Sequence, residues 1–268
     1  MSDPTQLPVS VSAFGLNPSF TDLVRRERPE ALPQSLGGSM TAAAVSQVPH
    51  GTTVLGMKYA DGVIVAGDRR ATAGYTIADD KMRKVFPADD YSAIAIAGAA
   101  GMAVEMVKLF QLELEHYEKL TGDRLSLEGK ANRLRQLIRE NFPLAMQGLV
   151  VVPLFGGYDL RRGEGRIFHY DATGGRWEED DFQSTGSGSQ PAKNSLKKRW
   201  RRDLDRPAAL RVAVEALLDA SEDDVATGGP NPTRKIYPVV LAVTADGASE
   251  VPESEVEAAV AAVLGERS

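Results

Sequence analysis

The order of apolar and polar positions divides the chain near residue 52. Before that point no period of 2 or 3.6 residues is sustained, and the segment 1–51 holds six of the fifteen prolines. Such a segment buries too little apolar surface to offset the entropy lost when it is ordered. After that point, strand and helix periods follow one another almost without interruption. The pattern predicts a largely disordered leader, 1–51, and one packed domain, 52–268.

The packed region begins with two predicted hairpins. Thr53–Tyr59 and Val63–Asp68 flank Asp61-Gly62, a dipeptide typical of tight β turns. Lys84–Phe86 and Tyr91–Ala97 form the second pair. Further strands are expected at 149–156, 166–170, 182–184, 235–244 and 248–251, with 166–170 and 182–184 linked through the segment 171–175.

Apolar residues recur at helical spacing in five other segments. These are 102–120, 126–147, 191–202, 207–221 and 253–265. Pro143 is expected to kink or end the second of them. Strands and helices come in groups rather than in strict alternation, which favours an α+β fold. We expect a four-layer αββα sandwich, with two antiparallel sheets between two helix layers.

Composition excludes several classes of protein. The chain is 43% hydrophobic and 25% charged, and 268 residues less the 51 of the leader leave 217, enough for one well-buried core. The net charge of −6 argues against nucleic acid as the main partner, so the basic segment 193–206 is interpreted as a solvated or subunit-contacting helix face. The absence of cysteine excludes disulfides, thiolate zinc sites and cysteine nucleophiles.

The sequence also points away from membranes and metals. No apolar run approaches the roughly 18 residues that a membrane-spanning helix needs, and the first residues do not resemble a secretory signal. We therefore expect a cytoplasmic protein with no membrane partner. His50, His116 and His169 are too scattered to predict a metal cluster or the base of a Ser-His-Asp triad. No metal and no cofactor are expected.

The boundary itself carries the candidate chemistry, Gly51-Thr52-Thr53. Cleavage after Gly51 would leave a hydroxyl and a free amine on Thr52, a nucleophile and a base in one residue. Such a site also needs a cation near the amine, an acid that holds the cation, and a backbone N–H directed at the oxyanion.

Three residues could supply these groups. Asp68 ends the strand that pairs with the strand after Thr52, Lys84 opens the next hairpin, and Gly98 begins a turn of small residues before a long helix. Each of these residues taken alone has a more ordinary interpretation. An Asp before two arginines is usually a turn or surface residue, and a Lys at the start of a strand is usually solvated. A Gly between a strand and a helix is usually only a turn residue.

Six motifs carry a family resemblance in their order and spacing. They are Gly51-Thr52-Thr53, Ala66-Gly67-Asp68-Arg69-Arg70, Lys84-Val85-Phe86, Ile96-Ala97-Gly98, Ser184-Thr185-Gly186-Ser187-Gly188-Ser189 and Asp224-Val225-Ala226-Thr227-Gly228-Gly229. The region 52–268 resembles a 20S proteasome β subunit of the actinobacterial type, which has a long propeptide. The leader resembles the family only in its position and its terminal glycine. The resemblance implies the N-terminal nucleophile hydrolase fold and a threonine-type endopeptidase that is made as a zymogen.

The resemblance also implies residue roles. Thr52 would be the nucleophile, with its own amine as proton acceptor, either directly or through a water. Asp68 and Lys84 would form the buried pair that tunes the hydroxyl and the amine, and the Gly98 N–H would bind the oxyanion.

Three more residues would surround the Thr52 amine. Ser187 and Asp224 would hydrogen-bond around it and orient it, together with Thr227. The family more often has serine at the position of Thr227; because both side chains offer a hydroxyl, a small effect is expected.

The family's substrate pocket falls on small or apolar residues here: Ala71, Thr72, Met82, Ile96, Ala100 and Val104. None is acidic, so none would pair with a basic substrate side chain. We expect cleavage after apolar or aromatic residues.

Processing would use the same chemistry. The Thr52 hydroxyl would attack the Gly51 carbonyl, giving an ester that water opens, and glycine would tolerate the strained backbone of this attack. Until then the amine is part of a peptide bond, so the precursor should be inactive toward other substrates.

The partners that the resemblance implies are other subunits and unfolded proteins. Family members form heptameric β rings, and two of these stack between two rings of α subunits as α7β7β7α7. An ATPase ring would feed unfolded or tagged proteins through the α subunits.

Two alternatives stay open at this point. One is the simpler hexameric ATP-dependent bacterial protease that shares the N-terminal Thr, although its mature chain is shorter and its propeptide minimal. The other is a non-catalytic ring or scaffold subunit, which would be expected to lack Thr52, Asp68 or Lys84.

Overall fold

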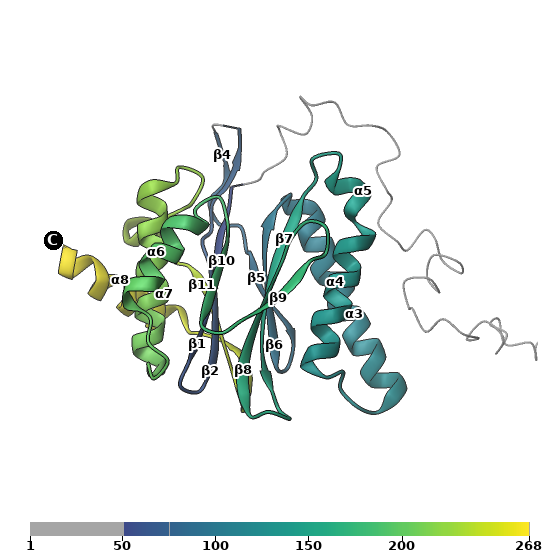
Figure 1. The fold of residues 1–268 in the computed structure, drawn as a ribbon. Coiled ribbons are helices and arrows are strands. Elements are labelled where there is room, and N and C mark those ends of the chain that lie inside the picture. Colours follow the sequence, from purple (N-terminus) through teal and green to yellow (C-terminus); the bar gives the residue numbers. More distant parts are fainter. Residues whose placement is uncertain (1–50, 75, 268) are drawn as a thin grey trace, which may run out of the picture. The chain divides into compact units, whose positions relative to one another are not determined.

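Two five-stranded antiparallel sheets form the centre of the protein (Figure 1). The computed structural model describes residues 51–74 and 76–267, so the expectations for residues 1–50 lie outside the described residues. The first sheet has the order β10 (Phe182–Gly186), β1 (Thr53–Tyr59), β2 (Gly62–Gly67), β11 (Val239–Thr244) and β12 (Gly247–Glu250). The second has the order β5 (Val85–Asp89), β6 (Ser92–Gly98), β7 (Val151–Asp159), β8 (Glu164–Tyr170) and β9 (Arg176–Glu179).

Helices cover the outer face of each sheet. The helices are α3 (Ala100–Thr121), α4 (Leu127–Glu140), α5 (Phe142–Ala145), α6 (Ser189–Arg199), α7 (Arg206–Asp223) and α8 (Glu253–Arg267). Figure 1 shows α3 and α4 beside the second sheet, and α6, α7 and α8 beside the first. Within the part of the chain that the structure describes, no helix is long and apolar enough to cross a membrane.

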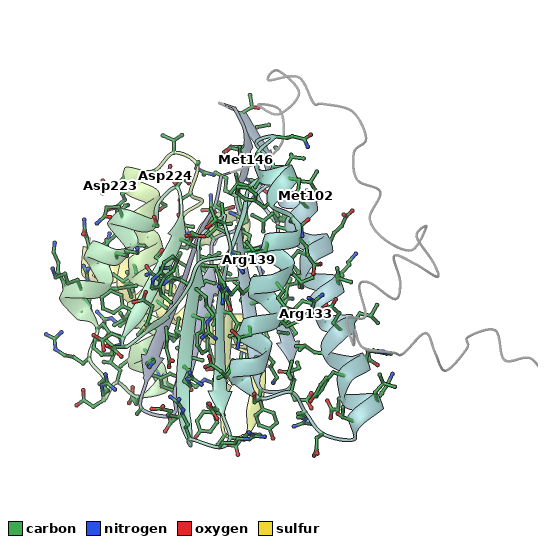
Figure 2. All side chains as sticks on the ribbon, turned by 45° about the vertical axis from the view of Figure 1, so that its right-hand side comes forward. Met102, Arg133, Arg139, Met146, Asp223 and Asp224 are labelled. Carbon is green, nitrogen blue, oxygen red and sulfur yellow. The ribbon has the colours of Figure 1, made fainter. Side chains whose placement is uncertain are left out.

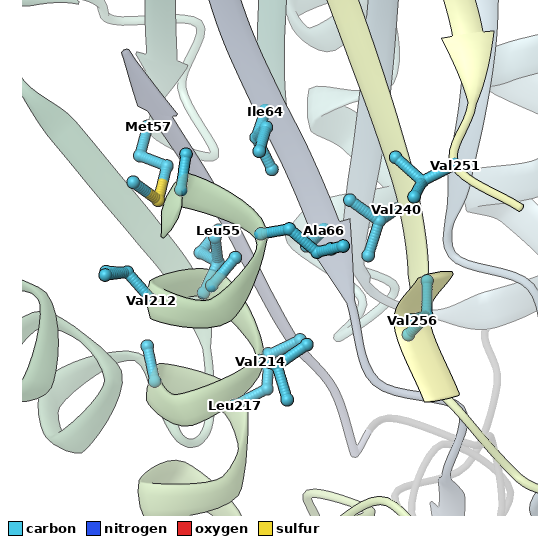
Figure 3. Packing of buried hydrophobic residues seen from close by; sticks show 14 of the residues in the cluster. Leu55, Met57, Ile64, Ala66, Val212, Val214, Leu217, Val240, Val251 and Val256 are labelled. Carbon is cyan, nitrogen blue, oxygen red and sulfur yellow. The ribbon is translucent and has the colours of Figure 1, made fainter. Parts of the chain in front are cut away.

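The alternation of side chains along β1 explains the layers. Leu55 and Met57 point outward and pack with α7 residues such as Leu217 (Figure 3). Val54 points inward and packs between the two sheets with Leu154 of β7. Because both faces of the strand are buried, its sequence is apolar almost throughout. With a third cluster between the second sheet and α3 and α4, these contacts confirm the αββα sandwich.

The predicted helix 126–147 ends earlier than expected. Ser126 caps α4 by accepting a hydrogen bond from the Gly129 N–H, and the helix stops at Glu140. A separate short helix, α5, holds Pro143 in its first turn. Proline lacks an N–H and clashes with the preceding turn, so it is placed where a helix begins.

The segment 171–175 does not link 166–170 directly to 182–184 as expected, because β9 lies between them. β8 turns back into β9, where His169 faces Trp177, whereas β10 pairs with β1 in the other sheet, where Ser184 faces Leu55. β9 was missed because its sequence, Arg-Trp-Glu-Glu, is that of a polar edge strand.

Two further strand predictions need correction. A small hairpin of β3 (Ala71–Ala73) and β4 (Thr76–Asp79) was not expected. The strand expected from 235 begins only at Val239, because a 3₁₀ turn, η3 (Pro232–Arg234), precedes it and Pro238 has no N–H for the ladder.

Strand register gathers the candidate residues at one end of the sheets. Thr53 faces Gly186 on one side, and Val54 faces Gly67 on the other, so the segments that follow β2 and β10 lie beside the start of β1. Figure 2 shows Asp224, after α7, and Met102, early in α3, at the same upper end.

Candidate active site

The peptide bond between Gly51 and Thr52 is buried and activated by two donors. The Thr52 hydroxyl donates to the Gly51 carbonyl oxygen at 2.6 Å. The Lys84 ammonium donates to the same oxygen at 3.1 Å. Two donors on one carbonyl draw electron density from its carbon and stabilise the negative charge that an attack there would create. The hydroxyl that could make this attack belongs to the adjacent residue.

Lys84 forms a fully buried ion pair with Asp68. The distance from Nζ to the Asp68 carboxylate is 2.6 Å, and both side chains are 0% exposed. Lys84 also donates to the carbonyl oxygen of Arg70. Burial lowers the pKa of the Lys84 ammonium, and the charge of Asp68 opposes part of that fall. Three acceptors therefore hold a cation against the Gly51–Thr52 bond.

The Asp68 carboxylate is fixed by backbone donors. One oxygen accepts the Thr53 N–H at 2.8 Å. The other accepts the N–H groups of Arg70 at 2.9 Å and Gly228 at 2.8 Å. These bonds join the start of β1, the segment after β2 and the segment after α7. The structure therefore brings Thr52, Asp68 and Lys84 together, and their catalytic roles stay predictions.

Ser187, Asp224 and Thr227 form a second cluster. The Ser187 hydroxyl and the Thr227 hydroxyl each donate to Asp224 Oδ2 at 2.5 Å. The Ser187 N–H donates to the carbonyl oxygen of Thr52 at 2.9 Å, so this cluster is tied directly to the proposed nucleophile. The turn before α6 and the segment after α7 bring the three hydroxyl and carboxylate groups together.

Gly98 ends β6 in a conformation that favours glycine. Its φ is +111°, and a Cβ there would lie 2.0 Å from the Val150 carbonyl oxygen. This explains the residue type, whereas the use of its N–H as an oxyanion donor stays a prediction.

The expected substrate pocket is connected to the site through Thr72. The Thr72 hydroxyl lies against Gly51. Ala71 and Ile96 are buried, and they lie close in sequence to Arg70 and Gly98, respectively. Met82, Ala100 and Val104 are half-buried. The binding roles of these residues stay predictions.

Arg70 is a site residue to which the sequence analysis gave no role. Its guanidinium donates to the carbonyl oxygens of Val225 at 2.9 Å and Thr227 at 3.2 Å. These hydrogen bonds link the segment after α7 to the segment that contains Asp68. The only sequence signal was its place in the motif Ala66–Arg70, because its contacts lie more than 150 residues away.

Comparison with known proteins identifies the family of this chain. The model of the family described as proteasome subunit matches residues 48–231. The chain belongs to the proteasome subunit family. The proteasome subunit beta of Frankia casuarinae is 49% identical to this chain over 271 residues, which span 100% of this chain and 98% of the relative. That of Streptomyces griseus subsp. griseus is 53% identical over 249 residues, which span 93% of this chain and 88% of the relative.

These relatives confirm the resemblance to β subunits of the actinobacterial type. The two matches span 100% and 93% of this chain, which favours a proteasome β subunit over the shorter hexameric protease. Membership of the proteasome subunit family also implies assembly with other proteasome subunits.

Gly51 is confined on two sides, which explains why a glycine precedes Thr52. A Cβ at this position would lie 2.4 Å from the Thr72 hydroxyl oxygen and 2.7 Å from the Ala226 carbonyl oxygen. Both distances are too short for a carbon atom, so a side chain would displace the Gly51 carbonyl from Lys84. From the sequence, the glycine at position 51 is explained by its tolerance of a strained backbone. The lack of space for a side chain is a second reason.

We expect Gly51→Ala to slow self-processing at least about tenfold, because displacements near 1 Å in a reacting group cost rate factors of this size or more. The time course of the full-length and shortened chains by intact mass measures the effect. Gly265→Ala in α8 is the matched control, since a Cβ there meets nothing within 4 Å. Processing of Gly51→Ala at the rate of the unchanged chain would contradict the steric explanation.

Proposed function

We propose that the chain is the precursor of a threonine-type endopeptidase, and that Thr52 is released by self-cleavage after Gly51. The observation that carries the proposal is the convergence of the Thr52 hydroxyl and the Lys84 ammonium on the Gly51 carbonyl oxygen. If Lys84 had only a structural role, it would not need to be buried against the Gly51–Thr52 peptide bond. The family membership supports the same conclusion.

Self-cleavage proceeds through an ester. Thr52 Oγ forms a bond to the Gly51 carbonyl carbon, and Lys84 stabilises the negative charge on the carbonyl oxygen. The hydroxyl proton passes to the Thr52 nitrogen as the C–N bond breaks. Water then hydrolyses the ester, leaving a carboxylate on Gly51 and a free hydroxyl and amine on Thr52.

The mature site repeats these steps on other chains. The Thr52 amine accepts the proton of its own hydroxyl as Oγ attacks a substrate carbonyl, and the Gly98 N–H binds the oxyanion. Ser187 and Asp224 orient the amine. Because the amine exists only after cleavage, the precursor does not hydrolyse other substrates.

Intact mass of the purified protein tests the proposal directly. We expect a product that begins at Thr52, together with hydrolysis of an unfolded protein that increases as this product accumulates. A chain that keeps its leader, or one that is cut elsewhere while hydrolysis proceeds, would exclude Thr52 as the nucleophile.

The proposed assembly is α7β7β7α7, in which seven copies of this chain form each β ring. An ATPase ring that acts through the α subunits would supply unfolded or tagged proteins, in the cytoplasm. Support comes from the family and from the two β-subunit relatives. The native mass of the chain co-produced with an α subunit tests the stoichiometry.

The proposed pocket predicts cleavage after apolar or aromatic residues. Its six residues, Ala71, Thr72, Met82, Ile96, Ala100 and Val104, carry no charge, so burial of a substrate Lys or Arg there would leave an unpaired cation. Fluorogenic peptides that differ only in the residue before the scissile bond measure the preference. Faster cleavage after Arg or Lys than after Leu, Phe or Tyr would contradict the proposed pocket.

A further inference from the structure

Thr53, the residue after the proposed nucleophile, is fully buried with every polar atom bonded. Its N–H and carbonyl oxygen both bond to Asp68, at 2.8 Å and 3.1 Å. Its hydroxyl oxygen accepts the Gly188 N–H at 2.9 Å and lies 2.6 Å from the Thr227 hydroxyl oxygen. The Thr53 hydroxyl thus reaches the turn before α6, whereas the Thr52 hydroxyl bonds to the Gly51 carbonyl oxygen, which also accepts from Lys84.

The proton directions along this contact are determined by the available donors. The Thr227 hydroxyl has one proton, and it donates that proton to Asp224 Oδ2. In the contact between the two threonines, Thr53 must therefore be the donor. The result is a series of hydrogen bonds that all run in one direction. The Gly188 N–H donates to the Thr53 hydroxyl, the Thr53 hydroxyl donates to the Thr227 hydroxyl, and the Thr227 hydroxyl donates to Asp224. Each bond in such a series polarises the next.

Gly188 leaves the space that the two hydroxyls occupy. A Cβ at Gly188 would lie 2.5 Å from the Thr53 hydroxyl oxygen and 2.6 Å from that of Thr227. Any side chain at 188 would therefore push the two hydroxyls out of position. The turn provides both the N–H that starts the series and the room for it.

We propose that Thr53 is a positioning residue for the threonine protease chemistry. Its hydroxyl fixes the rotamer of Thr227, and Thr227 in turn fixes the Asp224 carboxylate that orients the Thr52 amine. The inference rests on the proposed function of Thr52. It also gives Thr227 a defined task, in which the hydroxyl must accept from one side and donate to the other.

Thr53→Val in the assembled, full-length protein tests the proposal, because valine keeps the branched shape but cannot donate. We expect kcat per processed subunit to fall between about 10- and 100-fold, with KM little changed. The acidic limb of the pH–rate profile should also shift, since the environment of the amine changes. Thr53→Ser should recover activity to within about threefold of the unchanged protein, and Gly188→Ala should give the same kinetic signature as Thr53→Val.

Ser184→Ala is the matched control. Ser184 is also buried in the first sheet, and its hydroxyl donates to the Val54 carbonyl oxygen at 2.8 Å, but it has no bond to Asp224 or Thr227. Its removal should leave kcat and the pH–rate profile unchanged. A loss in Ser184→Ala equal to that in Thr53→Val would show that any lost hydroxyl in this sheet has the same effect, and would overturn the inference.

The decisive measurement is the double variant with Thr227→Val. If Thr53 acts through Thr227, then Thr53→Val adds little to the loss already caused by Thr227→Val. Losses that multiply in full would overturn the inference, as would a Thr53→Val protein with normal kcat. An unchanged chain that shows neither a Thr52 N-terminus nor hydrolysis would instead overturn the proposed function, so the two failures are distinguishable.

Discussion

Replacing Thr52 by alanine should leave the chain at its full length of 268 residues and abolish peptide hydrolysis. The hydroxyl that lies 2.6 Å from the Gly51 carbonyl oxygen would be absent, so no ester could form with Gly51 or with a substrate. Lys84 would still polarise the carbonyl, but attack by water is intermolecular and lacks the proximity of the Thr52 hydroxyl, so it would be far slower. Intact mass and the hydrolysis of an unfolded protein report the two losses separately.

Thr52→Ser is the matched control for this experiment, since serine keeps the attacking hydroxyl and loses only a methyl group. We expect it to be processed and to retain hydrolysis. A Thr52→Ala protein that is shortened to residue 52 would show that another protease removes the leader. Hydrolysis by that variant would exclude the threonine mechanism altogether.

Replacing Lys84 by methionine should stop both reactions and destabilise the fold. Methionine fills a similar volume but donates no hydrogen bond to the Gly51 oxygen, and we expect a loss of about 10²- to 10³-fold, the range for a lost oxyanion donor. It also leaves Asp68 charged and buried without its partner. Removal of one member of a buried pair costs about 3–5 kcal/mol in stability.

A double variant separates the two effects of Lys84→Met. Adding Asp68→Asn removes the uncompensated charge, so the melting temperature should recover while processing and hydrolysis stay absent. Lys119→Met is the control, because Lys119 forms only an exposed ion pair with Glu115 on α3. Processing by Lys84→Met at an ordinary rate would show that the cation is not part of the chemistry.

The proximity of the proposed nucleophile, acid and lysine could be predicted from local sequence. Gly51-Thr52 lies at a change of pattern, Asp68 follows a strand whose hairpin partner begins at Thr53, and Lys84 precedes the next strand. Antiparallel pairing across one tight turn is enough to bring Asp68 beside the start of β1. The family motifs then supplied Ser187 and Asp224, which periodicity alone could not have connected.

The errors in the predicted fold have the same physical origin. β9 is a polar edge strand, β4 is exposed throughout, and the ladder after Pro238 starts late. None of them has the apolar alternation that a half-buried strand shows.

The sequence by itself determined the layered α+β fold, and it predicted the boundary at Thr52 and the residue types of a threonine hydrolase, because periodicity and short-range hairpins are local. Only the tertiary structure decided the contacts over long separations. It placed Lys84 on the Gly51 carbonyl, enclosed Gly51 between Thr72 and Ala226, and joined Thr53 to Thr227 across 174 positions of sequence. Such contacts depend on the packing of two sheets and a helix end, which no local pattern specifies.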